Sequence, residues 1–265
     1  MTDGPDPTGR PRRVLVLGGT GEARALAAAL AGRPGWRVVS SLAGRVSSPT
    51  LPAGEVRIGG FGGPAAMAGW ITAEGLDAVV DATHPFAARI TAAALAAAPA
   101  AGVPLLLLRR PGWTAGPGDD WRRVPTVPAA ALAVAALPGP VLLTTGRGGL
   151  TSFAALPHRF VIRTVDPPDP PLPADAELVL GRGPYTEAGE LDLMRRHGIR
   201  LLVTKDSGGD MTAAKLAAAR ALRVPVVMVD RPDVPGAELV PQAPDVAAAL
   251  EWLSGRGGAA RPPRR

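Results

Sequence analysis

Short apolar runs alternate along this chain with Ala- and Leu-rich stretches of helical length. The first run, Arg13–Leu17, reads RVLVL and leads directly into Gly18-Gly19-Thr20-Gly21. This pattern predicts a buried parallel strand that enters a tight turn. The stretch Glu22–Ala31 that follows is rich in Ala and Leu and predicts a helix.

The alternation continues through both halves of the chain. In the first half, we expect strands at Trp36–Ser41, Glu55–Ile58, Asp77–Asp81 and Val103–Leu108, with helices at 64–74 and 85–101. In the second half, we expect strands at Val141–Thr144, Arg159–Val165, Glu177–Leu180, Arg200–Thr204 and Val224–Val229, with helices at 148–156, 186–197, 212–222 and 245–253. Such alternation predicts right-handed βαβ units and open parallel sheets.

The segment Arg109–Pro125 breaks the periodicity and is expected to be a linker or a lid, so that the two halves join near residues 110–138. The predicted fold class is α/β, with two Rossmann-like parallel-sheet half-domains and a cleft between them. The expected boundaries are a flexible leader at 1–12, domains at 13–124 and 125–254, and a disordered basic tail at 255–265. Ligands of open α/β sheets bind beyond the carboxyl ends of the strands, so the cleft is the expected site.

The composition of the chain argues against several classes of partner. The net charge is +6, but the tail after Gly255 carries +4 and the leader Met1–Arg13 carries +1, which leaves about +1 for the rest. Because aromatic residues make up only 4% of the chain, we expect no nucleic-acid partner. The chain has no Cys and no metal-like His spacing, so no metal site is expected. No stretch resembles a signal peptide or a membrane span, which predicts a cytoplasmic protein without a membrane partner.

The first glycine loop is a candidate for binding a dinucleotide. Glycines at 18 and 19 would let the backbone approach a pyrophosphate, while Thr20 and Glu22 lie where the helix N-terminus supplies N–H groups. The dinucleotide fingerprint is incomplete, because Arg24 occupies the place of the third Gly. A structural turn without ligand, with Glu22 as a first-turn carboxylate, is the alternative.

The end of the second strand indicates which nucleotide would bind. NAD sites usually place an acidic residue about 20 residues after the loop. Here residues 40–45 read SSLAGR and contain no acid. Ser41 and Arg45 suit a 2′-phosphate, which favours NADPH over NADH, although Arg45 could equally be a solvated loop residue.

Other polar groups follow strand ends. Thr83 and His84 would border the cofactor, with His84 either a proton donor or a structural residue. In the second half, the candidate substrate-binding residues are Arg147, Tyr185, Lys205, Ser207 and Gly208. Candidates for the catalytic groups are His84, Tyr185, Lys205 and Asp206. A Lys205–Asp206 pair that merely closes a turn is the alternative for that loop.

Lysine usage supports a special role for that region. Of 29 basic residues only Lys205 and Lys215 are lysines, in a chain that otherwise uses Arg. Lys provides a compact charge with a tunable pKa, which Arg does not.

The ordered set of motifs resembles the precorrin-6A reductase family over residues 14–254. The segments that carry the resemblance are GGTGEAR, SLAGR, DATHPFA, RPGW, LLTTGR, GPYTE, VTKDSGG and VPVVMVDRP. The resemblance implies reduction of precorrin-6A, or its cobalt form, to precorrin-6B by hydride transfer from NADPH in cobalamin biosynthesis. It also implies that domain 13–124 binds NADP and domain 125–254 binds the polycarboxylate tetrapyrrole substrate or the cofactor.

Two other functions remain open at this point. One is another tetrapyrrole-pathway enzyme, such as a methyltransferase, and the other is a non-catalytic NADP-binding sensor. Neighbouring enzymes of the cobalamin pathway are candidate protein partners.

Overall fold

The structure is a computed structural model that describes residues 9–44 and 51–255. The chain forms two compact units. The first takes in the chain up to Arg110 and again from Asp233, and the second is Pro111–Pro232. This division differs from the boundaries expected at 124/125 and 254. One strand within residues 13–124 belongs to the second unit, and the last helix, which was expected in the second domain, belongs to the first unit.

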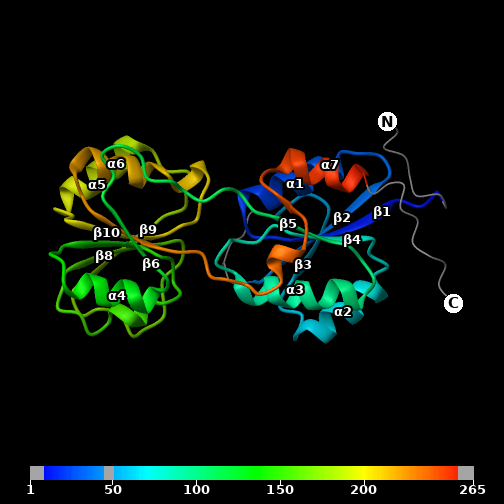
Figure 1. Ribbon diagram of the computed structural model, residues 1–265, viewed down its shortest axis with the longest axis horizontal. Coiled ribbons are helices and arrows are strands. Elements are labelled where there is room, and N and C mark those ends of the chain that lie inside the picture. Colours follow the sequence, from blue (N-terminus) through cyan, green and yellow to red (C-terminus); the bar gives the residue numbers. More distant parts are fainter. Residues whose placement is uncertain (1–8, 45–50, 256–265) are drawn as a thin grey trace. The chain divides into compact units, whose positions relative to one another are not determined.

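The first unit is built on a six-stranded parallel sheet (Figure 1). Its strands are β1 (Arg12–Leu17), β2 (Trp36–Leu42), β3 (Glu55–Ile58), β4 (Ala78–Asp81), β5 (Leu105–Leu108) and β12 (Gln242–Ala243). They are arranged in the order β12-β5-β4-β1-β2-β3. The chain moves outward from β1 to β2 and β3, then crosses to β4 on the other side. The carboxyl ends of β1 and β4 therefore form a topological switch point, where open α/β sheets bind ligands.

Helices cover both faces of this sheet. Figure 1 shows α1 (Gly21–Ala31) and α7 (Val246–Gly255) on one face, and α2 (Pro64–Ala73) and α3 (Ala88–Ala100) on the other. Val14 and Val16 pack toward the first pair of helices, whereas Leu15 and Leu17 pack toward the second pair. Burial on both faces explains why β1 is an unbroken apolar run rather than an alternating one.

The second unit has its own six-stranded parallel sheet, in the order β6-β11-β10-β7-β8-β9. Its strands are β6 (Trp121–Val124), β7 (Val141–Thr144), β8 (Phe160–Thr164), β9 (Ala176–Leu180), β10 (Leu201–Lys205) and β11 (Val226–Val229). One face carries α5 (Glu187–Arg196) and α6 (Ala214–Leu222), and the other carries α4 (Val127–Ala135) (Figure 1). Short 3₁₀ turns lie at Leu150–Phe153 and Asp210–Thr212 in this unit and at Ala237–Leu239 in the first. The predicted class, two parallel-sheet α/β halves, is confirmed.

Three local expectations were wrong. The supposed linker contains β6, an edge strand that pairs with β11. Its exposed Arg122 and Arg123 interrupt the apolar pattern by which strands were predicted. Helix α4 follows directly, with Thr126 as its N-cap. Helix α3 begins at Ala88 rather than at Pro85, because the backbone N–H of Ala87 donates to the carbonyl of His84 (2.7 Å) and holds a turn before the helix.

The first sheet has the strand order of a dinucleotide-binding fold throughout, although its sixth strand, β12, joins β5 only after the chain has completed the second unit. In the second sheet the corresponding edge position is taken by β6, which precedes the other strands of that sheet in sequence. The other five strands of the second sheet follow the dinucleotide-binding order.

Candidate functional site

The loop between β1 and α1 lies at the switch point of the first sheet. Thr20 caps α1: its hydroxyl accepts from the N–H of Ala23 (3.1 Å) and donates to the carbonyl of Ala82 (2.7 Å). The N–H of Gly18 donates to the carbonyl of Ser41 (2.9 Å), so the loop is fixed to the ends of both β2 and β4. Gly19 has φ +113°, and a Cβ there would project into open space. The backbone at Gly19 and the N-terminus of α1 therefore form a cradle that fits a phosphate group.

Glu22 forms an ion pair with Arg110. The carboxylate accepts from the guanidinium at 2.7 Å, and both side chains are more than two-thirds buried. Glu22 thus connects the first turn of α1 to the segment that leaves the first unit. Sequence reasoning placed Glu22 correctly at the loop but did not identify this partner.

Ser41 ends the buried part of β2, and its hydroxyl lies 3.5 Å from the guanidinium of Arg57 on β3. The two residues are register partners on neighbouring strands. Arg57 was not predicted as a site residue. Arg45 lies outside the residues that the structure describes.

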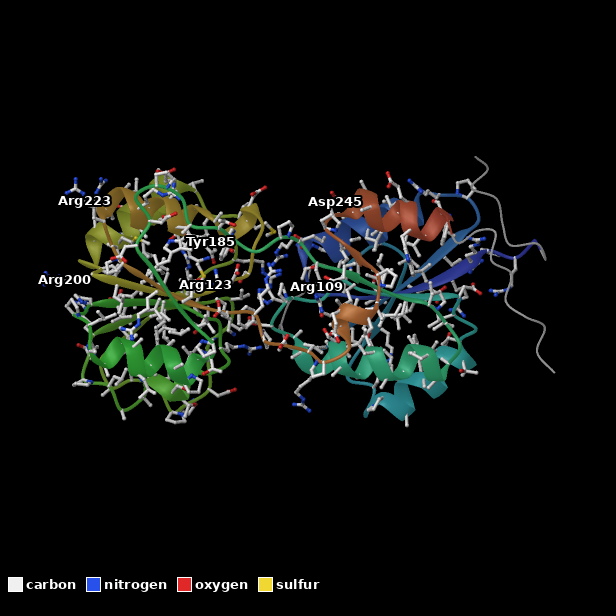
Figure 2. The ribbon with its side chains drawn as sticks, viewed as in Figure 1. Arg109, Arg123, Tyr185, Arg200, Arg223 and Asp245 are labelled. Atoms are coloured by element: carbon white, nitrogen blue, oxygen red, sulfur yellow. The ribbon has the colours of Figure 1, made fainter. Side chains whose placement is uncertain are left out.

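Asp81, at the end of β4, is the centre of a buried hydrogen-bond network. Its side chain is fully buried and accepts from the N–H (3.0 Å) and hydroxyl (2.6 Å) of Thr83, from the hydroxyl of Thr91 (2.6 Å) and from Arg109 (2.9 Å). Arg109, labelled in Figure 2, also donates to the carbonyl of Thr83 (2.8 Å). This network fixes the backbone that presents His84. Asp81 belongs to one of the motifs that mark the family, whereas Thr91 and Arg109 gave no sequence signal.

His84 lies beyond this network, on the turn before α3. Its Nδ1 accepts from the N–H of Phe86 (3.2 Å). A neutral imidazole that accepts at Nδ1 carries its proton on Nε2. His84 is only partly buried and lies at the carboxyl edge of the first sheet.

In the second unit, Asp206 is held by contacts of its own. The side chain is almost fully buried; Oδ1 accepts from the N–H of Trp113 and Oδ2 from Arg123, both at 2.9 Å. Arg123 is labelled in Figure 2. Hydrogen bonding to Asp206 raises the pKa of Arg123. Arg123 on β6 is thus an ion-pair partner of Asp206 that sequence reasoning did not identify. These contacts connect the segment after Pro111 to the end of β10.

The surroundings of Gly208 leave no room for a side chain. It has φ +66°, and a Cβ would lie 2.1 Å from the carbonyl oxygen of Pro111 and 2.5 Å from the guanidinium of Arg231. Ser207 lies on the same turn, where its N–H donates to the carbonyl of Lys205 (2.7 Å). The loop after β10 is therefore tightly constrained.

Lys205 and Arg147 lie at the carboxyl ends of neighbouring strands, because β10 pairs with β7. Lys205 is half-buried, and burial lowers its pKa. Arg147 is exposed. The hydroxyl of Thr145, the residue after β7, is buried and has no hydrogen-bond partner among the described residues. The two cations at this edge are of the kind that binds carboxylates.

Tyr185 lies further along the same edge, after β9 (Figure 2). Its hydroxyl donates to the carbonyl of Gly181 (2.7 Å), and its ring stacks on the guanidinium of Arg163 at 3.9 Å. Burial raises the pKa of Tyr185. The N–H of Tyr185 donates to the carbonyl of Met211 (3.3 Å), which ties its loop to the loop after β10.

Beneath these loops is a cluster of buried charges that the sequence did not reveal. Arg163 forms an ion pair with Glu190 at 2.5 Å, and both side chains are nearly inaccessible. Lys215, 3% exposed, donates to the carbonyl of Thr212 (2.7 Å) and lies 4.6 Å from the ring centroid of Trp113. Burial, reinforced by Arg163, lowers the pKa of Lys215 to about 7.

Within residues 9–44 and 51–255, no group of His, Asp and Glu side chains could hold a metal ion. None of the helices in these ranges is both long enough and apolar enough to span a membrane.

The sequence and fold were compared with those of known proteins. The model of the family described as precorrin-6x reductase CbiJ/CobK matches residues 13–254. A precorrin-6A reductase of Rhodococcus erythropolis is 52% identical over 91% of this chain and 97% of its own. One of Rhodobacter capsulatus is 45% identical over 94% of this chain and 98% of its own. The solved structure of CobK precorrin-6A reductase covers 93% of this chain and 97% of its own with a TM-score of 0.85 and 44% identity.

These matches include both units and every glycine loop described above. The chain belongs to the precorrin-6x reductase family.

Proposed function

We propose that this protein reduces precorrin-6A to precorrin-6B with NADPH, as a step of cobalamin biosynthesis. The observation that carries the proposal is the 52% identity, over nearly the full length of both chains, to a protein named precorrin-6A reductase. The phosphate cradle at the switch point of the first sheet is the structural feature that supports a dinucleotide.

The first unit would hold the cofactor. The backbone at Gly18 and Gly19, with the N-terminus of α1, would bind the pyrophosphate. Ser41 at the end of β2, with no acid in the same place, favours the 2′-phosphate of NADPH over the free ribose of NADH. When bound there, NADPH would supply a hydride to an electron-poor carbon of the macrocycle.

The second unit would bind the carboxylates of the macrocycle. Lys205 and Arg147 provide two cations at the ends of adjacent strands. Tyr185 and Asp206 would position the surrounding loops, since the phenol donates to Gly181 and both carboxylate oxygens of Asp206 accept from the protein. Ser207 and Gly208 would keep the loop of Lys205 in its constrained shape.

The reaction consumes one proton in addition to the hydride. His84 is our candidate for the group on the protein side that assists this proton transfer. With Nδ1 accepting from the N–H of Phe86, a neutral imidazole can donate a hydrogen bond from Nε2, whereas release of a proton to the substrate requires the charged ring. Replacing His84 by Gln should then lower the turnover number while leaving the dissociation constant of NADP⁺ unchanged.

The test is an assay of the purified chain with precorrin-6A and NADPH. We expect loss of the nicotinamide absorbance together with a product heavier by two hydrogens. A methyltransferase would consume no NADPH, and a sensor would bind NADPH without turnover, so either result would refute the proposal. Parallel assays with the cobalt form of the substrate would identify which form is reduced.

A further inference from the structure

Beside the cradle, the first sheet carries a cation whose surroundings are unlike those of a surface arginine. Arg57 lies on β3, one residue before the carboxyl end of that strand. Its guanidinium stacks on the ring of Phe61 at 3.9 Å from the centroid and lies 5.4 Å from the ring centroid of Trp70. A guanidinium stacked on an aromatic ring loses little further side-chain entropy when it binds an anion.

The same guanidinium is oriented by hydrogen bonds. It donates to the carbonyls of Gly59 (2.6 Å) and Gly60 (2.7 Å) and lies 3.5 Å from the hydroxyl of Ser41. A guanidinium has five N–H donors, and these contacts engage three of them. In the part of the chain that the structure describes, no carboxylate forms an ion pair with Arg57. Its charge is therefore not neutralised by an acid of the described chain.

Arg57 lies where the adenosine ribose of a dinucleotide would be expected if its pyrophosphate occupied the cradle. The cradle lies after β1, and β2 and β3 are the next strands in the sheet. In dinucleotide-binding sheets the pyrophosphate lies at the first helix N-terminus and the adenosine ribose at the end of the second strand. A 2′-phosphate at the end of β2 would meet Ser41, whose side chain faces Arg57 on the adjacent strand.

We propose that Arg57 and Ser41 form the subsite that binds the 2′-phosphate of NADPH and thereby sets the preference for NADPH over NADH. This inference rests on the proposed function, because it assumes that a dinucleotide occupies the cradle. It adds a cation from β3 to the one expected from Arg45 in the loop after β2.

Direct binding measurements with nucleotide fragments test the subsite without the chemical step. The probes are 2′,5′-ADP, which carries the 2′-phosphate, and 5′-AMP, which lacks it, titrated by calorimetry into the full chain. For the wild type we expect tighter binding of 2′,5′-ADP. For Arg57→Met we expect 2′,5′-ADP to bind on the order of 10- to 100-fold more weakly, as for loss of a charge-assisted hydrogen bond, with 5′-AMP unchanged.

The matched control is Arg37→Met, which removes an exposed arginine near the amino end of β2. This variant should retain the wild-type preference, because its cation lies at the opposite end of the strand. If Arg57→Met keeps that preference as well, Arg57 does not bind the 2′-phosphate and the inference is wrong, while the proposed function stands. If the wild type binds neither 2′,5′-ADP nor NADP⁺, the proposed function itself fails.

Arg57→Met could also disturb the Gly59–Gly63 turn that the guanidinium supports. Arg57→Lys addresses this, because it keeps the charge but loses the planar fork. We expect its affinity for 2′,5′-ADP to lie between those of the wild type and Arg57→Met, with an unchanged melting temperature. Equal weakening of 2′,5′-ADP and 5′-AMP binding in both variants would show that Arg57 only supports the turn, and would overturn the inference.

Discussion

Lys215 is a buried amine whose charge should make the stability of this protein depend on pH. It is 3% exposed, and its Nζ contacts the carbonyl of Thr212 and the face of Trp113 rather than a carboxylate. The other charges that influence it are Arg163 and Glu190, which form an ion pair with each other. We consider Lys215→Met, which keeps the length and apolar character of the side chain but removes the ionisable group.

The direction in which pH changes the stability follows from the pKa of Lys215 in the folded and unfolded states. The pKa of Lys215 is about 7 in the folded protein, whereas in the unfolded chain it takes the ordinary lysine value of 10.5. Below pH 7 both states bind the proton, and the folded state carries the full cost of the buried charge. As the pH rises from 7 toward 10.5, only the unfolded state binds the proton, so the folded state gains relative stability.

The size of the effect follows from the same two values. Between pH 6 and pH 9 the wild type should gain on the order of 2–3 kcal/mol in the free energy of unfolding from Lys215 alone. In Lys215→Met this contribution is absent. The variant's stability relative to the wild type should therefore fall by the same amount over this range.

Urea denaturation at pH 6, 7, 8 and 9, followed by tryptophan fluorescence, measures this difference. A change of this size corresponds to about 1 M in the urea midpoint for a unit of this size. Arg220→Met is the control, because it removes an exposed cation from the same helix, α6, whose guanidinium does not titrate between pH 6 and 9. If the midpoints of wild type and Lys215→Met differ by a constant amount across the four pH values, Lys215 does not lose its proton in the folded state and the reasoning is wrong.

Three shorter predictions concern the site. Arg45→Ala should raise the Michaelis constant for NADPH more than about tenfold, as for loss of a charge-assisted contact, with little change for NADH; equal effects on both would exclude contact with the 2′-phosphate. Lys205→Met should impair turnover of the macrocycle while NADP⁺ affinity, measured by calorimetry, stays near that of the wild type; loss of NADP⁺ binding would assign Lys205 to the cofactor. Gly208→Ala should cost at least about 2 kcal/mol in urea denaturation, since its Cβ would overlap the carbonyl of Pro111. Gly198→Ala, with φ +59° and open space around the Cβ, should cost less, and equal losses would attribute the effect to backbone conformation alone.

Most of the regular structure could be predicted because its signals are local. Buried parallel strands such as β1 and β10 are continuous apolar runs, and the turns after them are marked by Gly. Strand β6 escaped because an edge strand has one side free of neighbours, and Arg122 and Arg123 made it resemble a linker. Helix α4 did have a local signal, Thr126 followed by Pro128 in the first turn, which is typical of a helix start.

The pairing of β12 with β5 had no local signal at all. The two strands are separated in sequence by the whole second unit, and β12 has only two residues. A short strand such as β12 could join the sheet of either unit, and long-range packing decides which one. The expected domain boundaries therefore followed the order of the sequence, whereas the observed units do not.

The candidate site residues also differ in whether a local sequence pattern marks them. Candidate residues at the ends of strands that lead into glycine loops, such as Thr20 and Lys205, could be proposed from the sequence. Arg57, Arg109 and Arg163 could not, because the chain uses Arg for nearly all its cations. What distinguishes these three is the environment that the fold gives each guanidinium: the ring of Phe61 in the turn after β3, the buried carboxylate of Asp81 at the end of β4, or a buried ion pair with Glu190 on α5.

The scarcity of lysine is the exception, because composition alone drew attention to Lys215, which the structure shows to be buried. An Arg at position 215 would remain charged at any pH that the folded protein tolerates, because the guanidinium cannot be deprotonated in proteins. It would bring an uncompensated charge beside the Arg163–Glu190 pair. A Lys can instead lose its proton, as its lowered pKa indicates, and still donate to the carbonyl of Thr212. The physical reason for Lys at this position is thus that a primary amine, unlike a guanidinium, can exist there without charge, and the pH dependence of the free energy of unfolding follows from that property.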